Sequence, residues 1–381
     1  MGEMSLYQIA ISSMLIGWFI GLILIWVRYG QFPHAKLILV AILLWPLLLL
    51  DEWLKLSGYE SQLSFLVGTS QFFSAIIIAC VVLSIRQLTI AKFANNNILF
   101  FIPCLLLIAG QLPLWLESNE VRVGMLFSPP VGDLLVNWPF YATYLFTAII
   151  TLSFAVHAAE YLASYHYYLS DQVVDIDIFE MRFTANGCYI LMFTSFLSIC
   201  IIGLAMFDWL PAIVHWQTLV NMLNAIGCLY IILLLVQNRK YSPTPFVYSQ
   251  MDKKTYSEDH LRFTLKQAEK AIIQHKAYKR KGLRIKQVAD AAHVEPAALA
   301  LATRFVLNRN FRAFVYHYRL EYAKKVLMRT DQKVTSVARR LGFNSEKYLS
   351  NVFVKYIGLM SKRDKKKNAK AVKMNSPKTA K

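Results

Sequence analysis

The side chains best suited to specific chemistry lie near the C-terminus. Phe343, Leu349 and Phe353 follow the spacing of a helix core, so helical geometry turns the positions between them outward. The outward positions are Glu346, Lys347, Ser350 and Asn351. In a DNA groove, asparagine can pair with adenine, lysine donates to guanine and glutamate accepts from cytosine. We therefore take these four residues as candidates for DNA base contacts, with ordinary solvated side chains as the alternative.

Basic side chains near this segment are suited to the DNA backbone. The candidates for phosphate contacts are Arg304, Arg309, Arg312, Arg339, Arg340 and Lys355. Contacts between basic groups and phosphate oxygens fix the position of a protein on DNA without reading its sequence. We therefore expect these residues to position the domain and not to select the bases.

A separate group of polar side chains lies inside long apolar stretches of the first half. The candidates for a membrane signal pocket are Gln71, His215, Asn221 and Asn224. Asn221 and Asn224 are three residues apart and share a helix face. They could line a pocket for a small signal, but hydrogen bonding between helices is the more frequent role of such residues.

The DNA-contact candidates belong to a pattern that occurs twice, over 283–299 and 334–349. Val288-Ala289 in the first copy matches Val337-Ala338 in the second, 49 residues further on. In each copy a short amphipathic helix ends at a tight turn and a second helix follows. Gly342 can take the left-handed conformation that ends a helix. This is the pattern of a helix-turn-helix motif, whose second helix enters the major groove of DNA.

The region 255–365 resembles the DNA-binding domain of the AraC family of bacterial transcription regulators. The second copy matches the family signature at Val337, Ala338, Gly342, Phe343, Ser345, Tyr348, Leu349, Phe353 and Gly358. Residues 310–327 are similar to the family's long linker helix, with Arg319, Ala323 and Leu327 at its spacing. The resemblance implies an all-α domain of two helix-turn-helix motifs joined by a linker helix, which binds double-stranded DNA.

The sequence departs from the family pattern in two places. The second motif closes with Met360-Ser361 and Asp364-Lys365, where the family has Thr-Pro and an aromatic-Arg pair. In the second helix of the first motif, we expect Leu299 and Thr303 to face the core. The groove-facing positions are then Ala297, Ala298, Ala300, Leu301 and Arg304. Apart from the arginine, these can at best touch thymine methyl groups, so the first motif is a phosphate clamp or a packing unit.

The first half contains seven apolar stretches, each long enough to cross a hydrocarbon core of roughly 30 Å. They lie near 7–27, 35–54, 63–85, 97–116, 134–157, 187–209 and 212–236. Connections rich in Lys and Arg fall on one side, which places the N-terminus outside and the C-terminus in the cytoplasm. Residues 1–236 are therefore expected to form a seven-helix transmembrane bundle in a bacterial inner (cytoplasmic) membrane.

The net charge of the chain changes from negative to positive at the end of the last apolar stretch. Residues 1–236 contain 7 Lys and Arg against 13 Asp and Glu, a net charge of −6, whereas residues 237–381 contain 34 against 10, a net charge of +24. A basic half suits DNA, and it could also adhere to anionic lipid headgroups. The helix-turn-helix pattern favours DNA.

The rest of the chain divides into three segments. Residues 237–282 are expected to be a juxtamembrane linker and a connecting helix that starts at Ser257, residues 283–365 the DNA-binding domain, and residues 366–381 a basic, disordered tail. The apolar stripe of the connecting helix is Leu261, Leu265, Ala268 and Ile272, which we expect to pack on the next domain and not to dimerise.

Two features leave alternatives open. The connection 158–186 is acidic; a solvated loop is the ordinary explanation, and docking against the basic half is the alternative. Gly17 and Gly21 form a GxxxG pair, which allows close helix contact within the chain or in a homodimer.

No enzyme signature is found, and the five cysteines lie in the apolar half without metal-ligand spacing, so we expect no catalysis, cofactor or metal. The expected function is a one-component sensor-regulator that couples a membrane or extracytoplasmic signal to gene expression. The alternative is a receptor or transporter-like protein whose basic domain binds a protein partner or anionic lipid. The expected partners are double-stranded DNA, the lipid bilayer and an unknown small-molecule or protein signal, with a homodimer as a further arrangement.

Overall fold

A computed structural model of the chain describes residues 6–31, 35–90, 96–209, 215–237, 256–329 and 333–342. Every regular element in these ranges is a helix, which confirms the predicted all-α class. The chain divides into two compact units. The first unit comprises residues 1–168 and 180–247, and the second comprises residues 169–179 and 248–381.

The first unit contains the apolar helices. Its elements are α1 (Leu6–Arg28), α2 (Ala35–Leu44), η2 (Trp45–Leu49), α3 (Leu50–Ser57), α4 (Ser70–Thr89), α5 (Ile102–Leu116), α6 (Asn119–Phe127), α7 (Leu134–Tyr168), α9 (Arg182–Met206) and α10 (Trp216–Gln237). Seven helices in the described ranges are long and apolar enough to cross a membrane, with α2, η2 and α3 together forming the second of them. The predicted number of long apolar helices is therefore confirmed.

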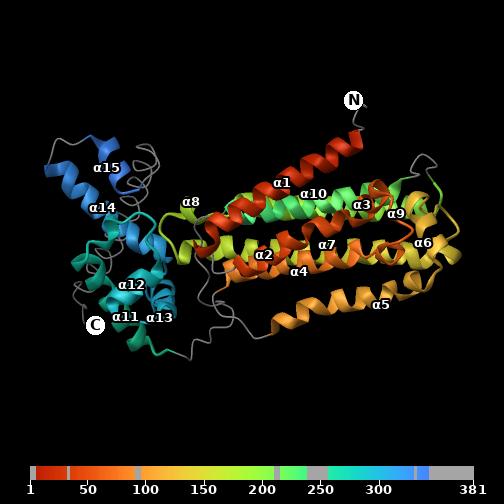
Figure 1. Ribbon diagram of the computed structural model, residues 1–381. Helices are drawn as coiled ribbons and strands as arrows, with labels where there is room; N and C mark the ends of the chain where they lie inside the picture. Colours follow the sequence, from red (N-terminus) through yellow and green to blue (C-terminus); the bar gives the residue numbers. More distant parts are fainter. Residues whose placement is uncertain are drawn as a thin grey trace, which may run out of the picture. The chain divides into compact units, whose positions relative to one another are not determined.

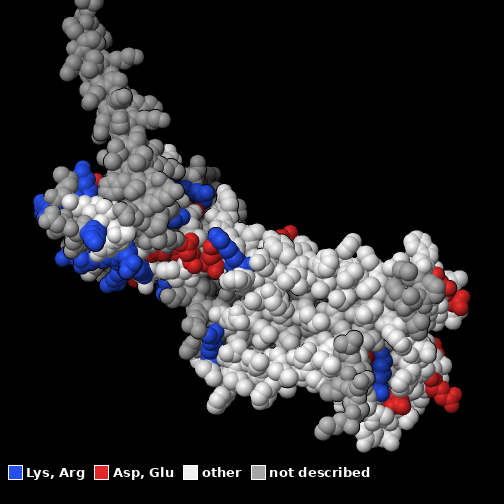
Figure 2. All heavy atoms as spheres, turned by 90° about the horizontal axis from the view of Figure 1, so that it is seen from above, with Lys and Arg blue, Asp and Glu red and all other residues white. Residues whose placement is uncertain are grey.

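The core of the first unit is formed by α4, α7, α9 and α10, which pack against one another in sequence and run side by side (Figure 1). Between α7 and α10, the rings of Phe140 and Tyr144 pack on Trp216 at centroid distances of 5.7 and 5.3 Å. The flank of the bundle seen in Figure 2 is nearly free of charged side chains along its length, as a surface against lipid requires.

The helix α7 is longer than a membrane span needs. It has 35 residues, which at 1.5 Å per residue is about 52 Å, against a hydrocarbon core of roughly 30 Å. The sequence predicted a span that ends at residue 157, whereas the helix continues without a break to Tyr168. Much of the expected 158–186 loop is therefore helical.

The GxxxG pair packs inside the chain. A Cβ atom on Gly17 would lie 3.2 Å from Leu229 of α10, and one on Gly21 would lie 2.5 Å from Ile42 of α2 and 3.0 Å from Leu233 of α10. The prediction of close helix contact is confirmed. Both glycines face helices of the same chain, so this contact leaves no room for the dimer seam that the sequence allowed.

The second unit contains shorter helices. They are η5 (Leu169–Asp171), α8 (Ile176–Phe179), α11 (Glu258–Gln274), η8 (Ala277–Lys279), α12 (Ile285–Ala292), α13 (Pro296–Leu301), the π-helix η9 (Ala302–Val306), α14 (Phe311–Arg329) and α15 (Val334–Arg340). The Ser257 hydroxyl caps α11 by accepting a hydrogen bond from the His260 amide at 3.2 Å. The apolar stripe of α11 is buried where this helix packs against α12, α13 and η9, as predicted.

We predict that Gly21→Leu lowers the thermal stability of the detergent-solubilised protein, because a larger side chain cannot fit between α1, α2 and α10. Overpacking of this kind costs about 1–3 kcal/mol. The matched control is Gly203→Leu on α9, since a Cβ atom there meets nothing within 4 Å. Equal melting temperatures for the two variants would contradict the packing of α1.

Candidate nucleic-acid interface

Both helix-turn-helix motifs have the turn that the sequence predicts. In the first, α12 ends at His293, which has a left-handed φ of 53°, and α13 follows from Pro296. In the second, α15 is followed by Leu341 and by Gly342, which has a φ of 80°. Glycine adopts this conformation at no steric cost, which explains its place after α15. The linker helix between the motifs is α14, whose first turn is capped by Asn310.

The second helix of the first motif is buried. Leu299 and Thr303 face the core as expected. The residues expected to face the groove but found buried are Ala297, Ala298, Ala300 and Leu301. That expectation was wrong because small apolar side chains let α11 and α12 pack closely on α13. Of the five positions only Arg304 is partly exposed, which favours the packing role of the first motif over base reading.

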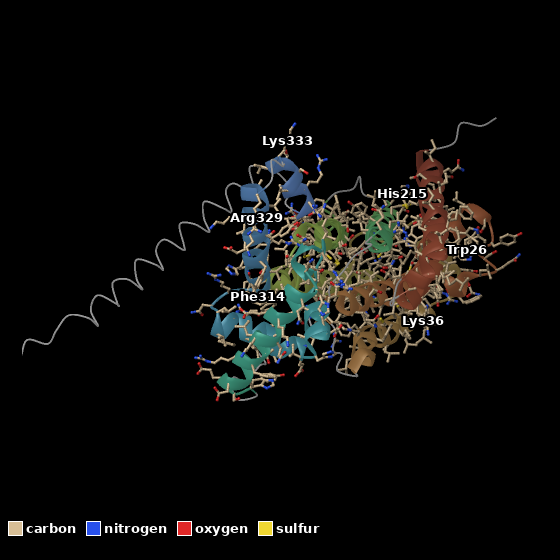
Figure 3. All side chains as sticks on the ribbon, turned by 90° about the vertical axis from the view of Figure 1, so that its left-hand side faces the viewer. Trp26, Lys36, His215, Phe314, Arg329 and Lys333 are labelled. Atoms are coloured by element: carbon tan, nitrogen blue, oxygen red, sulfur yellow. The ribbon has the colours of Figure 1, made fainter. Side chains whose placement is uncertain are left out.

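The second motif presents a basic surface. Arg339 and Arg340 at the end of α15 are exposed. Together with Lys281 and Lys333 they line a shallow hollow, to which Thr335 and Ser336 add hydroxyl groups. The side chain of Lys333 points away from the unit (Figure 3). Four cations beside two hydroxyl groups form a surface that fits phosphate oxygens.

The other candidates for phosphate contacts either interact with side chains of the second unit or are partly buried. Arg304 lies 3.6 Å from the Asp171 carboxylate, and Arg312 lies over the Tyr316 ring at 5.1 Å. Arg309 is partly buried. Burial also lowers the pKa of the His317 imidazole on α14, so this side chain adds no positive charge to the unit near neutral pH.

The candidate base contacts Glu346, Lys347, Ser350 and Asn351, and the phosphate candidate Lys355, lie outside the described residues. Their assignment therefore stays a prediction.

A buried ion pair joins two distant parts of the chain in the second unit. The Arg319 guanidinium on α14 is fully buried and donates to both Asp175 carboxylate oxygens, at 2.6 and 3.0 Å. It also donates to the carbonyls of Tyr278 and Arg280, at 2.9 and 2.8 Å. The second Asp175 oxygen accepts from the Gly282 amide at 2.6 Å. This two-point contact is the strong form of an arginine–carboxylate pair.

The chain beside Asp175 pairs with the segment that leads into α12. Val173 lies opposite Arg284 in an antiparallel bridge. The Val174 amide donates to the Leu283 carbonyl at 3.0 Å, and the Ile285 amide donates to the Gln172 carbonyl at 2.7 Å. Of the alternatives left open for the acidic connection, docking is the one observed for residues 169–179.

In the first unit, three of the four signal-pocket candidates form hydrogen bonds between helices. The Gln71 amide donates to Asn221 at 2.8 Å, and the Asn224 amide donates to Ser74 at 2.5 Å. Gln71 and Asn224 also border a cavity of about 10 Å³, close to the smallest that holds one water molecule. His215, directly before α10, is exposed and does not line this cavity.

Sequence reasoning missed a pair of buried acids at the end of the second span. The Asp51 carboxylate accepts from the Gly68 amide at 3.0 Å and from the Ser70 hydroxyl at 2.7 Å. It also lies 3.4 Å from the Tyr144 hydroxyl, which accepts a 2.7 Å bond from Gln217. Asp51 lies inside the expected span 35–54, and the sequence gives no signal for the partners of its carboxylate.

Glu52 connects further helices to the same network. It lies 3.2 Å from the Lys55 ammonium, accepts from the Asn221 amide at 3.3 Å and is hydrogen-bonded by the Tyr7 hydroxyl. Both acids are fully buried. The network therefore joins α1, α3, α4, α7 and α10 through hydrogen-bonded charge, which is costly to expose to lipid.

We predict that Arg319→Ala lowers the free energy of unfolding of the second unit by about 3–5 kcal/mol, because it leaves the Asp175 carboxylate buried without a counter-charge. Thermal unfolding of the full chain checks this. The matched control, Arg339→Ala, removes an exposed arginine and leaves the transition in place. An unchanged transition in Arg319→Ala would contradict the structural role of the pair.

Comparison with known proteins gives one match. A family model described as a helix-turn-helix domain matches residues 288–365, a range that begins in α12 and includes α13, α14 and α15. No curated protein and no solved structure matches the chain. The match therefore covers only residues 288–365, which belong to the basic part of the second unit.

Proposed function

We propose that this chain, in which residues 288–365 are a helix-turn-helix domain of the AraC type, is a membrane-bound transcription regulator. It binds DNA sequence-specifically and couples a membrane or extracytoplasmic signal to gene expression. The observation that carries the proposal is the presence, in one chain, of this domain and of seven helices apolar enough to span a membrane.

The charge distribution supports DNA as the partner of the second unit. Residues 237–381, which include most of this unit, have a net charge of +24, and Lys and Arg side chains gather on the face shown in Figure 2. A polyanion binds such a surface with affinity that falls as salt rises. The positive bias of the connections supports a cytoplasmic location for the domain, in the inner membrane of a bacterium.

The two motifs have different roles in this proposal. The first provides packing, because its second helix is buried. The second provides the reading helix, with Arg339 and Arg340 as phosphate contacts beside it. Base recognition then rests on Glu346, Lys347, Ser350 and Asn351.

The first unit provides the sensor in this proposal. A signal acts only if it binds two arrangements of the helices unequally. The network around Asp51 and Glu52 connects five helices, so a ligand or protein that changes one of these bonds would shift the packing of all of them. The described cavity beside Gln71 is too small for a signal molecule, so we place signal recognition in a rearrangement of the helices.

We predict that Asn351→Ala weakens binding by about 1–3 kcal/mol at operators with the matching base and relaxes selectivity at that one position. Arg340→Ala, by contrast, weakens binding to all duplexes alike and lowers the slope of log affinity against log salt by about one. Footprinting and salt titration separate the two. If both variants lost affinity for all duplexes alike, the assignment of base contacts to the second helix of the second motif would be wrong.

The direct test of the function is chromatin capture of the intact, membrane-inserted protein, compared with a chain that ends at residue 255. We expect enrichment of a small number of chromosomal sites that share a sequence and that disappear with the truncation. Binding to chromosomal DNA without enriched sites, together with unchanged transcripts after the truncation, would favour a basic domain that contacts lipid or a protein partner.

A further inference from the structure

The connection between α7 and α9 is built into the DNA-binding unit. Residues 169–179 cluster with the second unit although the helices on both sides of them belong to the first. Leu169, Val173, Val174 and Phe179 are buried. A short stretch of backbone pairing joins the segment to the chain just before α12.

Within this segment, one carboxylate binds the linker helix and the residue that precedes the first motif, and it lies close to the turn of the second motif. Asp175 binds Arg319 on the linker helix and accepts from the Gly282 amide ahead of the first motif. At Gly342, the turn of the second motif, a Cβ atom would lie 3.3 Å from the Asp175 carboxylate and 3.5 Å from the Arg319 guanidinium. The ion pair therefore lies at the meeting point of both motifs and the linker helix.

The buried position of Arg319 makes the docked segment necessary. Its side chain is fully buried, and its two backbone acceptors carry no charge. Removal of Asp175 would leave a buried guanidinium without a counter-charge, which is strongly unfavourable. The relation of the two motifs to each other thus depends on a residue of the connection between α7 and α9, which belongs to the second unit.

We propose that residues 169–179 are the element through which the membrane unit controls DNA binding. When the segment is docked, Asp175 holds the two motifs in the arrangement that binds DNA. A movement of α7 or α9 that withdraws the segment removes Asp175 and weakens DNA binding. The control role rests on the function proposed above, whereas the docking itself does not.

Short covalent connections favour this route over the link from α10. Six residues separate Asp175 from the end of α7, and six separate it from the start of α9. The α7 helix is also about 20 Å longer than the hydrocarbon core, by its number of residues, so one continuous helix is long enough to reach from the lipid to this segment. By contrast, 20 residues lie between α10 and α11.

Docking is tested by a disulfide in the full chain. Val173 and Arg284 form a non-hydrogen-bonded antiparallel pair, in which the Cα atoms lie about 4.5 Å apart, a distance that a disulfide bridges. In Val173→Cys/Arg284→Cys with a protease site in place of 241–246, oxidation should keep the two halves joined on a non-reducing gel after cleavage. The single variant Val173→Cys reports the background from the native cysteines.

In the double-cysteine protein, Asp175→Asn should lower the fraction of halves joined by the disulfide at least three-fold. Asp177→Asn, which changes an exposed acid on the same segment, should leave this fraction unchanged. Separate halves in the double-cysteine protein would overturn docking. If that protein does not fold, hydrogen exchange of the Val174 and Ile285 amides in the unmodified chain decides, since fast exchange of both would also overturn it.

The control role is tested by chromatin capture with the same two aspartate variants. We expect Asp175→Asn to lower the enrichment at the sites of the unmodified chain at least ten-fold and Asp177→Asn to retain it. Equal enrichment for both variants would overturn the control role while the proposed function stands. If the unmodified chain enriches no site, the proposed function fails and the control role fails with it, whatever the gel shows.

Discussion

The pairing of Asp175 with Arg319 is the interaction on which the second unit depends. A guanidinium keeps its charge at any pH that a protein meets, so an arginine in a protein interior needs acceptors for its donors and a negative charge close by. Here the acceptors come from the backbone on either side of Lys279, and the charge comes from the connection between two apolar helices. The stability of the second unit thus depends on how the apolar helices of the first unit are connected.

The same requirement applies in the first unit with the signs reversed. Asp51 and Glu52 are buried acids, and their oxygens are matched by hydroxyl, amide and ammonium donors from other helices. Apolar side chains alone give helices in lipid little preference for one neighbour over another, because lipid chains are as apolar as leucine. Directional bonds to buried carboxylates give the bundle a specific arrangement.

The sequence predicts those features that depend on neighbouring residues. Seven apolar stretches, the cap at Ser257, the stripe of α11 and the left-handed turn at Gly342 follow from local spacing and residue type, and the structure contains all of them. The partner of Arg319 could not be predicted, because 144 residues separate Arg319 from Asp175. No local pattern around either residue indicates that the two form a pair. Ala297 and Ala298 were ambiguous for a different reason, because alanine suits a groove and a core equally.

The place of residues 169–179 also constrains how the protein is made. The ribosome completes Asp175 before α9 and α10 and long before Arg319, so two further apolar helices are made before the aspartate can meet its partner. Domains made in one stretch of chain fold as they emerge, whereas the second unit also needs residues 169–179, which are made before α9 and α10. For the same reason a gene fusion that carried residues 256–381 to another protein would leave behind Asp175, a buried residue of the second unit.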